Sequence, residues 1–354
     1  MKYRSMTVPY LTIGLDLGDK FHHLFALRYD GEVVADQRIR NTKESLVKHF
    51  DSFPAARVVV EAGGQSQWIS EFLSNLGHEV IVASPTALGG KRQRRKNDRS
   101  DAEGLARKGR ADPKELKPIK HRPSTAQYDL SVIRARDCLV KLRTNTVNTV
   151  RSLMKTIGER LPSSSTEAFA KKMRSQIPNP LKPAVNPLLD TIQELTDRIT
   201  SYDNEVKRLA EKKYPETARL TQVSGVGHLT ALAFVLTLED YRRFSKSRKV
   251  GAFLGLVPAL DNSGNDEPQL KISKAGDCCL RRLMVNASHY ILGPLSGESD
   301  LKHHGEKLCV SGAKNAKKRA VIAVARKLSV LLHRLWASGD KYDPLFQQRK
   351  KISA

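Results

Sequence analysis

The stretch Ala56-Arg-Val-Val-Val-Glu61 decides the fold of this 354-residue chain. A continuous apolar run of this kind is typical of a parallel strand that is buried on both faces of a sheet. The run ends in an acid, Glu61, and open α/β sheets carry their ligand sites at the carboxyl ends of the strands. We therefore expect an α/β domain with a functional site beside Glu61.

The segments around this strand predict the rest of the sheet. Residues 12–18 (Thr-Ile-Gly-Leu-Asp-Leu-Gly) form a predicted strand that carries Asp16 towards its end. Two further strands, over 23–29 and 32–39, are joined by Asp30-Gly31, which is a strong hairpin signal. Helices are expected over 43–50 and about 67–76, and the last strand over 79–83. The order β-β-β-α-β-α-β-α describes an α/β domain whose first three strands form a meander.

A basic stretch with two acids inside it follows the last strand. From Leu88 to Arg122 the chain has 13 Lys and Arg residues against 5 Asp and Glu residues. If a helix begins at about Ser100, Asp98 and Asp101 lie on one face at its start. Taken alone, a pair of acids with this spacing is more simply explained as the solvent-exposed face of a helix. Oxygen ligands favour Mg²⁺ or Mn²⁺, and acids held among bases suggest metal-assisted chemistry on a phosphate polymer.

Four acids are thus candidates for one metal site. Asp16 and Glu61 sit on predicted strands, and Asp98 and Asp101 at a later helix. The alternative is that Asp16 pairs with a neighbouring base and Glu61 caps a helix. A buried strand seldom carries an unpaired acid, and here two strands carry one each. We therefore predict that Asp16, Glu61, Asp98 and Asp101 together bind Mg²⁺, with Mn²⁺ as a substitute.

Composition indicates a polyanionic partner. Lys and Arg total 61 and Asp and Glu 37, a formal net charge of +24, which favours nucleic acid over a membrane surface. The longest apolar runs are about ten residues, too short to span a bilayer. The four cysteines form no Cys-x-x-Cys pair, which disfavours a zinc site or a disulfide framework and fits a reducing cytoplasm.

The middle of the chain is predicted to be a pair of long helices. Residues 161–187 hold five prolines, which should break the helical pattern that begins at Thr125. Beyond the break, apolar residues alternate gaps of four and three over three heptads, as in a coiled coil. They are Leu188, Ile192, Leu195, Ile199, Tyr202, Val206 and Leu209. This seam fits either an antiparallel hairpin within the chain or self-association, and we favour self-association because a narrow hairpin leaves apolar surface uncovered.

A third unit carries signals for binding phosphates. Gly225-Val-Gly227 between two helical patterns suggests a helix-hairpin-helix, whose backbone N–H groups approach a phosphate, although a plain helical turn gives the same pattern. Arg281 and Arg282 begin a later helix. Residues 301–354 hold 13 Lys and Arg against 3 Asp and Glu, and they include an apolar helical stripe of Val321, Val324, Leu328, Leu331 and Leu335. We expect this basic helix to face nucleic acid.

Three motifs in this order resemble a known family. Gly14-Leu-Asp16-Leu-Gly, Val60-Glu61-Ala-Gly-Gly and Lys96-Asn-Asp98-Arg-Ser-Asp101-Ala-Glu-Gly-Leu-Ala-Arg are similar to the Asp-Glu-Asp-Asp domain of insertion-sequence transposases related to the Piv-type DNA invertases. The resemblance implies the RuvC-like variant of the ribonuclease H fold. It covers nearly the whole chain and implies three domains: a RuvC-like domain over 1–122, a coiled-coil helical domain over 123–215 and a mostly helical transposase domain over 216–354.

The second half resembles the family's serine domain, in which a Ser-Gly loop supplies a nucleophile. Here that residue is Ser263 in Asn262-Ser-Gly-Asn265, which by its sequence alone is most simply a turn residue. The loop departs from the family in continuing with Asp266-Glu267, and Ser273 is a weaker alternative nucleophile.

The resemblance implies a site-specific recombinase that moves an insertion sequence between donor and target DNA, guided in some members by a structured bridge RNA. It implies a phosphoserine DNA intermediate and a homodimer that pairs into a tetramer, with the site completed between protomers. The residues expected to contact nucleic acid are Arg92, Arg94, Arg95, Lys96, Arg99, Gly225, Gly227, Lys271, Lys274, Arg281 and Arg282.

Three other functions fit parts of the sequence. A RuvC-like junction nuclease would use the same acids to hydrolyse DNA without a covalent intermediate. An actin-like kinase or chaperone could use Gly14–Gly18 as a phosphate loop, but Gly63-Gly64 and Gly89-Gly90 are poorly placed for its other loops and the charge of +24 does not fit. A non-catalytic RNA-binding protein would leave the four acids without a purpose.

Overall fold

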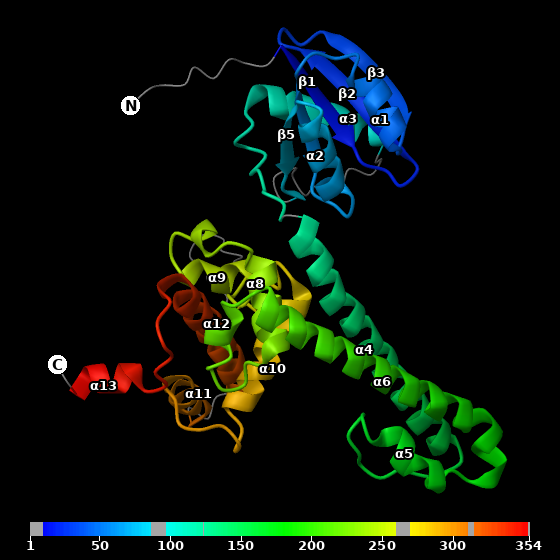
Figure 1. Ribbon diagram of the computed structural model, residues 1–354, viewed down its shortest axis with the longest axis vertical. Coiled ribbons are helices and arrows are strands. Elements are labelled where there is room, and N and C mark those ends of the chain that lie inside the picture. Colours follow the sequence, from blue (N-terminus) through cyan, green and yellow to red (C-terminus); the bar gives the residue numbers. More distant parts are fainter. Residues whose placement is uncertain (1–9, 86–96, 123, 260–269, 311–314, 353–354) are drawn as a thin grey trace. The chain divides into compact units, whose positions relative to one another are not determined.

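The computed structural model describes residues 10–85, 97–122, 124–259, 270–310 and 315–352 (Figure 1). The chain divides into two compact units, Met1–Ser124 and Thr125–Ala354. The boundary between them falls two residues beyond the predicted end of the first domain. The helices on either side of residues 215 and 216 share one apolar core. The further division predicted at this point stays a prediction.

The first unit is built on one mixed five-stranded sheet of order β3-β2-β1-β4-β5. Strands β1 to β3 form the predicted antiparallel meander, and β1, β4 and β5 run parallel. The element order is the predicted one. The elements are β1 (Leu11–Asp16), β2 (Phe21–Arg28), β3 (Val33–Arg40), α1 (Lys43–Phe50), β4 (Arg57–Glu61), α2 (Ser66–Asn75), β5 (Glu79–Ala83) and α3 (Asp98–Ala111).

Helices cover both faces of this sheet because alternate residues of each central strand point to opposite faces. Ile13 and Leu15 of β1 pack with Leu46 and Phe50 of α1 on one side, in the core that α2 also joins. On the other side α3 packs through Leu105 against β4 and β5, and through Ala102 and Ala106 against β2. The unbroken apolar run at 58–60 is therefore buried on both faces, as its sequence predicts.

The second unit begins with a pair of long helices, α4 (Ser124–Thr156) and α6 (Lys182–Lys212), with the short α5 (Phe169–Met173) near the turn between them (Figure 1). Val147, Val150 and Met154 of α4 share a core with Val185, Leu189 and Ile192 of α6. The seam on α6 thus has a partner helix within its own chain. This is the antiparallel hairpin, which was the alternative to self-association. Self-association stays a prediction. Helix α6 begins at Lys182, before Pro187 rather than after it.

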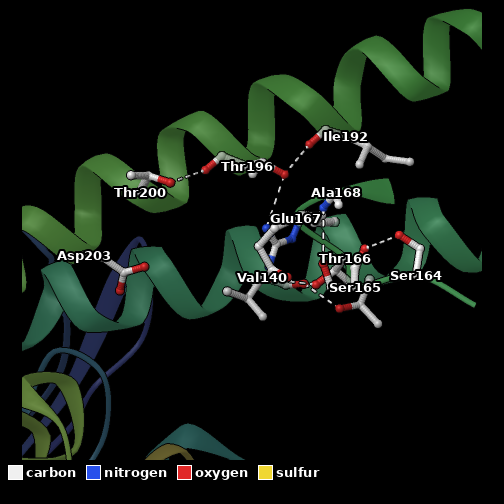
Figure 2. A network of polar contacts seen from close by, with 12 residues as sticks. Val140, Ser164, Ser165, Thr166, Glu167, Ala168, Ile192, Thr196, Thr200 and Asp203 are labelled. Atoms are coloured by element: carbon white, nitrogen blue, oxygen red, sulfur yellow. Dashed lines mark hydrogen bonds and ion pairs between the residues drawn. The ribbon is translucent and has the colours of Figure 1, made fainter. Parts of the chain in front are cut away.

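Two arginines of α4, Arg136 and Arg143, make polar contacts within this hairpin. Arg136 donates from Nε and Nη2 to the two carboxylate oxygens of Asp203, at 2.6 and 3.1 Å. The nearly buried Arg143 donates to Thr196 on α6 at 3.2 Å and to Glu167 at 2.9 Å. Figure 2 shows Glu167 and Thr196 drawn together at this point. The two arginine side chains are largely buried, at 19% and 7% exposed, although Asp203 and Glu167 are 45% and 61% exposed. A largely buried charge is costly without its partner, so the contacts of the arginines with Asp203 and Thr196 favour one register of the two helices.

The remaining helices pack around α12 (Ala316–Ser338). Its apolar residues Val324, Leu328 and Leu332 lie in the largest core of the chain. The predicted apolar stripe at 321–335 therefore packs in the core. The nucleic-acid contacts predicted for this helix stay a prediction and would have to lie on its opposite face. The other elements are α7 (Thr217–Leu220), α8 (His228–Leu238), α9 (Arg248–Phe253), α10 (Cys278–Ile291), α11 (Asp300–Val310) and α13 (Phe346–Ile352). Over the described residues, none of the helices combines the length and the apolar character that crossing a bilayer requires.

Candidate active site

Two of the predicted acids end neighbouring parallel strands. Leu15 of β1 pairs in register with Val60 of β4, so Asp16 and Glu61 follow at the same level. Side chains alternate along a strand, which directs both acids to the face where Gly14 and Val59 meet α3. Both acids are partly exposed at the carboxyl edge of the sheet. This is the edge at which the sequence predicted a site.

Helix α3 brings the other two acids to the same edge. A β-carbon on Gly14 would lie 1.9 Å from the Ala102 carbonyl oxygen, and one on Gly109 would lie 2.4 Å from a Val59 methyl and 3.4 Å from a Thr12 methyl. The helix therefore runs antiparallel to β1 and in close contact with it. From Ala102 back to Asp98 is about 6 Å of helix, close to the roughly 7 Å from Gly14 to Asp16. The first turn of α3 lies over the end of β1.

The start of α3 suits acidic residues. The Asn97 side chain accepts a hydrogen bond from the Arg99 N–H and caps the helix, which begins at Asp98, two residues before the predicted start. Asp98 and Asp101 occupy the first turn, where the helix dipole stabilises negative charge. Asp98 is exposed and Asp101 is partly exposed. No residue that the structure describes forms a hydrogen bond or ion pair with the side chain of Asp98, Asp101 or Glu61.

The four carboxylates supply the oxygen ligands that a hard divalent cation prefers, and they lie along one edge of the sheet. Their side chains do not converge, however: within the described ranges, no three His, Cys, Asp or Glu residues form a group that could hold a metal ion. Like charges resist convergence unless a cation lies between them. The backbone thus places the four acids along one edge of the sheet without bringing them together into a metal-binding group among the described residues.

A polar cluster that the sequence analysis missed flanks this edge. Asp36 of β3 forms an ion pair with Arg99 of α3 and a hydrogen bond of 2.8 Å with His23 of β2. The hydrogen bonds from His23 and then Arg99 hold the pKa of Asp36 below its usual value. Arg99, which was predicted to contact nucleic acid, therefore has a partner inside the protein. Alternation along β3 puts Asp36 on the α3 face, but the two partners are 63 positions apart, which hides the pair in the sequence.

The loop after Glu61 is held by a buried serine. The Ser66 hydroxyl donates to the Gly63 carbonyl at 2.8 Å, accepts from the Gly63 N–H at 2.9 Å and lies 2.9 Å from Nε2 of His121. Burial, followed by the charge of Arg122, lowers the pKa of His121. Gly63 and Gly64 face open space, where a β-carbon would meet nothing within 4 Å. The loop is thus fixed at its base and open beside Glu61.

Several residues predicted to bind phosphates in the second unit have structural contacts. Arg281 donates to the carbonyls of Ala275 at 2.6 Å and Leu254 at 3.1 Å, and Arg282 forms an ion pair with Asp137. Gly225 has φ +81° and packs so closely on α10 that a β-carbon would lie 2.9 Å from the Ala287 carbonyl oxygen. Gly227 precedes α8 and faces open space. Of these four, Gly227 best fits the predicted approach of a phosphate.

The described residues on either side of the predicted serine loop pair with each other. Pro258 and Ile272 form an antiparallel bridge, and the Ala259 N–H donates to the Lys271 carbonyl at 2.9 Å. Lys271, Ser273 and Lys274 are exposed beside this bridge. Some predicted site residues lie outside the described residues. They are Ser263, Arg92, Arg94, Arg95 and Lys96.

Comparisons with known proteins agree across both units. A family model described as Transposase, for the DEDD domain of the IS110 type, matches residues 13–159. A second, described as Transposase IS116/IS110/IS902 family, matches residues 217–295.

Curated relatives extend the match over most of the chain. The transposase for insertion sequence element IS1111A of Coxiella burnetii is 27% identical over 342 residues, which are 93% of this chain and 90% of that protein. A probable family 20 transposase of Pseudomonas aeruginosa is 26% identical over 82% of this chain and 86% of its own length. The transposase for IS1328 of Yersinia enterocolitica is 28% identical over 81% and 85%. The matched segments include the strands and helix that carry the four acids, and the chain belongs to the IS110/IS116 family of insertion-sequence transposases.

Proposed function

We propose that this DNA transposase cuts and rejoins strands with a metal-binding tetrad of Asp16, Glu61, Asp98 and Asp101. The observation that carries the proposal is the shared edge of the sheet, where β1, β4 and the first turn of α3 each bring acids to one level. A DEDD-type transposase domain depends on divalent metal in general, and oxygen-only donors favour Mg²⁺, with Mn²⁺ as a substitute. When bound, the ion would polarise a phosphodiester and stabilise the oxygen that leaves.

Ser263 is the proposed nucleophile, on the strength of the resemblance of its Ser-Gly loop to the family's serine domain. Its hydroxyl oxygen attacks the phosphorus of a DNA phosphodiester. The Oγ–P bond forms while one P–O bond to deoxyribose breaks, and the hydroxyl proton passes through solvent to the oxygen that leaves. The phosphoserine link keeps the energy of the bond, so the strands can be rejoined without ATP. Ser273, which is exposed beside the Pro258–Ile272 bridge, is the alternative nucleophile.

The partners that we propose are donor and target DNA, a structured guide RNA, and further copies of the chain. The net charge of +24 supports a large polyanionic complex. The relation to Piv-type invertases and the pairing of dimers into a tetramer are inferred from the sequence resemblance.

One gel tests the central step. The full-length protein is incubated with element-end DNA, the RNA transcribed from the element, and Mg²⁺, and the products are run in SDS. A recombinase of this kind gives a protein–DNA adduct that survives SDS and is removed by protease. Free DNA ends without any adduct would favour the junction nuclease, which hydrolyses with the same acids. Omitting the RNA from a parallel reaction tests the guide.

A further inference from the structure

We propose that Asp36 and Arg99 are positioning residues that clamp the first turn of α3 to the sheet. The clamp fixes the distance between the Asp98–Asp101 pair and Asp16, and thereby sets the affinity of the site for its divalent cation. This inference rests on the proposed function, because it assigns a purpose to the ion pair only if the four acids hold a metal.

The clamp joins three elements at the edge where the acids lie. His23 is the direct cross-strand partner of Asp16 in the β1–β2 register. Asp36 pairs with Phe25 in the β2–β3 register, so it lies one step along the same face and reaches His23 diagonally. The remaining Asp36 oxygen accepts from Nε of Arg99, which stands between Asp98 and Asp101 in sequence.

The first turn of α3 needs such a tether because its apolar anchors begin later. The first buried residue of the helix is Ala102, and residues 97–100 are all exposed. The Asn97 and Ser100 side chains make hydrogen bonds that stay within this turn. The Arg99 side chain instead reaches across to β3, and its guanidinium also lies 5.9 Å from the Phe25 ring centroid. The clamp therefore holds the part of α3 that carries two of the four acids.

Global stability is a poor explanation for this ion pair. The Arg99 side chain is 55% exposed and that of Asp36 is 25% exposed, and ion pairs at such sites contribute little to the free energy of unfolding. A contact that stabilises little can still select one geometry for a helix end. Variants of the clamp should therefore fold, which makes the positioning role testable apart from folding.

The experiment compares Asp36→Asn and Arg99→Ala in the full-length protein with Arg107→Ala as a matched control. Arg107 pairs with Glu103 on the same helix, so its loss removes an exposed ion pair that does not reach the sheet. Mn²⁺ affinity is measured by titration calorimetry or by electron paramagnetic resonance, and DNA affinity by filter binding. Loss of a supporting contact around a metal site weakens metal affinity by about 10–100-fold. We expect both clamp variants to weaken Mn²⁺ binding about tenfold and Arg107→Ala to leave it unchanged. Arg99→Lys, which keeps the charge but loses the planar fork, should fall between.

The two clamp variants separate positioning from direct DNA contact. If Arg99 instead binds phosphate, Asp36→Asn frees it and tightens DNA binding, Arg99→Ala weakens DNA binding, and Mn²⁺ affinity stays unchanged in both, which overturns the inference. Asp101→Asn is the reference for the site itself and should abolish Mn²⁺ binding. If Asp101→Asn binds Mn²⁺ like the parent protein, the proposed metal site is wrong and the clamp falls with it. If Asp101→Asn fails to bind and both clamp variants bind normally, the proposed function stands and only the clamp is wrong. Circular dichroism melting of every variant identifies any loss of fold.

Discussion

Gly14 of β1 lies directly against the backbone of Ala102 in α3, where a β-carbon on the glycine would be 1.9 Å from the Ala102 carbonyl oxygen. No side chain fits in that space unless the strand and the helix move apart. The same contact sets the first turn of α3 level with Asp16. A single glycine therefore controls how closely two groups of acids approach each other.

Gly14→Ala should separate α3 from β1 and reduce DNA cleavage together with stability. Forcing a methyl group into a closed contact costs about 1–3 kcal/mol in the free energy of unfolding. Gly104→Ala is the matched control, because a β-carbon at this position of α3 meets nothing within 4 Å. Alanine in the middle of a helix should stabilise by about 0.5–1 kcal/mol relative to glycine. Denaturant unfolding and a cleavage assay check both variants, and a Gly14→Ala protein with parental stability and cleavage would contradict the close contact.

Replacing Asp16, Glu61, Asp98 or Asp101 singly with Ala should abolish strand cleavage with little loss of fold. The four side chains lie at the exposed or half-exposed edge of the sheet, so their removal leaves no buried cavity. Glu103→Ala is the control, because it removes a partly exposed acid of the same helix that pairs with Arg107. Cleavage of labelled element-end DNA in Mg²⁺ is the measurement. Near-parental activity in any two of the four variants would remove the tetrad.

Ser263→Ala should lose the covalent adduct and keep nucleic-acid binding. One hydroxyl adds little to binding that is dominated by charge, and the adduct requires the Oγ–P bond. Ser273→Ala is the matched comparison and should form the adduct normally. An SDS gel scores the adduct, and a mobility-shift assay scores binding. The reverse pattern, with the adduct lost only in Ser273→Ala, would move the nucleophile to Ser273.

Mixing an Asp16→Ala protein with a Ser263→Ala protein should restore some adduct formation if sites are completed between protomers. Each mixed pair then keeps one site with both an intact tetrad and an intact serine. Single-strand cleavage and the adduct are the proper measurements, since full recombination could require every site in the complex. Mixed pairs that form, as shown by two different affinity tags, yet give no adduct would mean that each chain builds its own site.

The first unit should lose stability as the pH falls below about 6.5. Burial is the main cause that lowers the pKa of His22, His78 and His121 in the folded protein. An unfolded histidine has a pKa of about 6.5, so below this pH the unfolded chain binds protons that the folded chain does not, and the free energy of unfolding decreases until the folded pKa is passed.

His22 should contribute most clearly to this pH dependence. Its side chain is fully buried, and the effect of burial on its pKa outweighs the opposing contact with the Asn41 side chain. Urea unfolding between pH 8 and pH 5 measures the decrease, and His22→Leu should make it shallower. A free energy of unfolding that is flat or rises towards pH 5 would contradict the prediction.

Local sequence patterns were enough to predict the sheet and the edge at which the four acids lie, and they suggest the kind of chemistry. Strands such as 57–61 are specified by residues next to one another, and the Asp30-Gly31 turn is equally local. Because the carboxyl ends of parallel strands share one edge, knowing that Asp16 and Glu61 end two such strands was enough to bring them together. The helical seam at 188–209 was also visible as a repeat.

The partner that each charged or packed group takes could be read only from the folded chain. Arg99 and Arg282 each look like phosphate contacts in a basic sequence, yet they pair with Asp36 and Asp137, which lie 63 and 145 residues away. The seam on α6 packs against α4 of the same chain, with Arg143 buried between the helices. Charge attraction and burial depend on distance in space. A sequence pattern shows which residues are able to pair, but the fold sets which of them come within reach of each other.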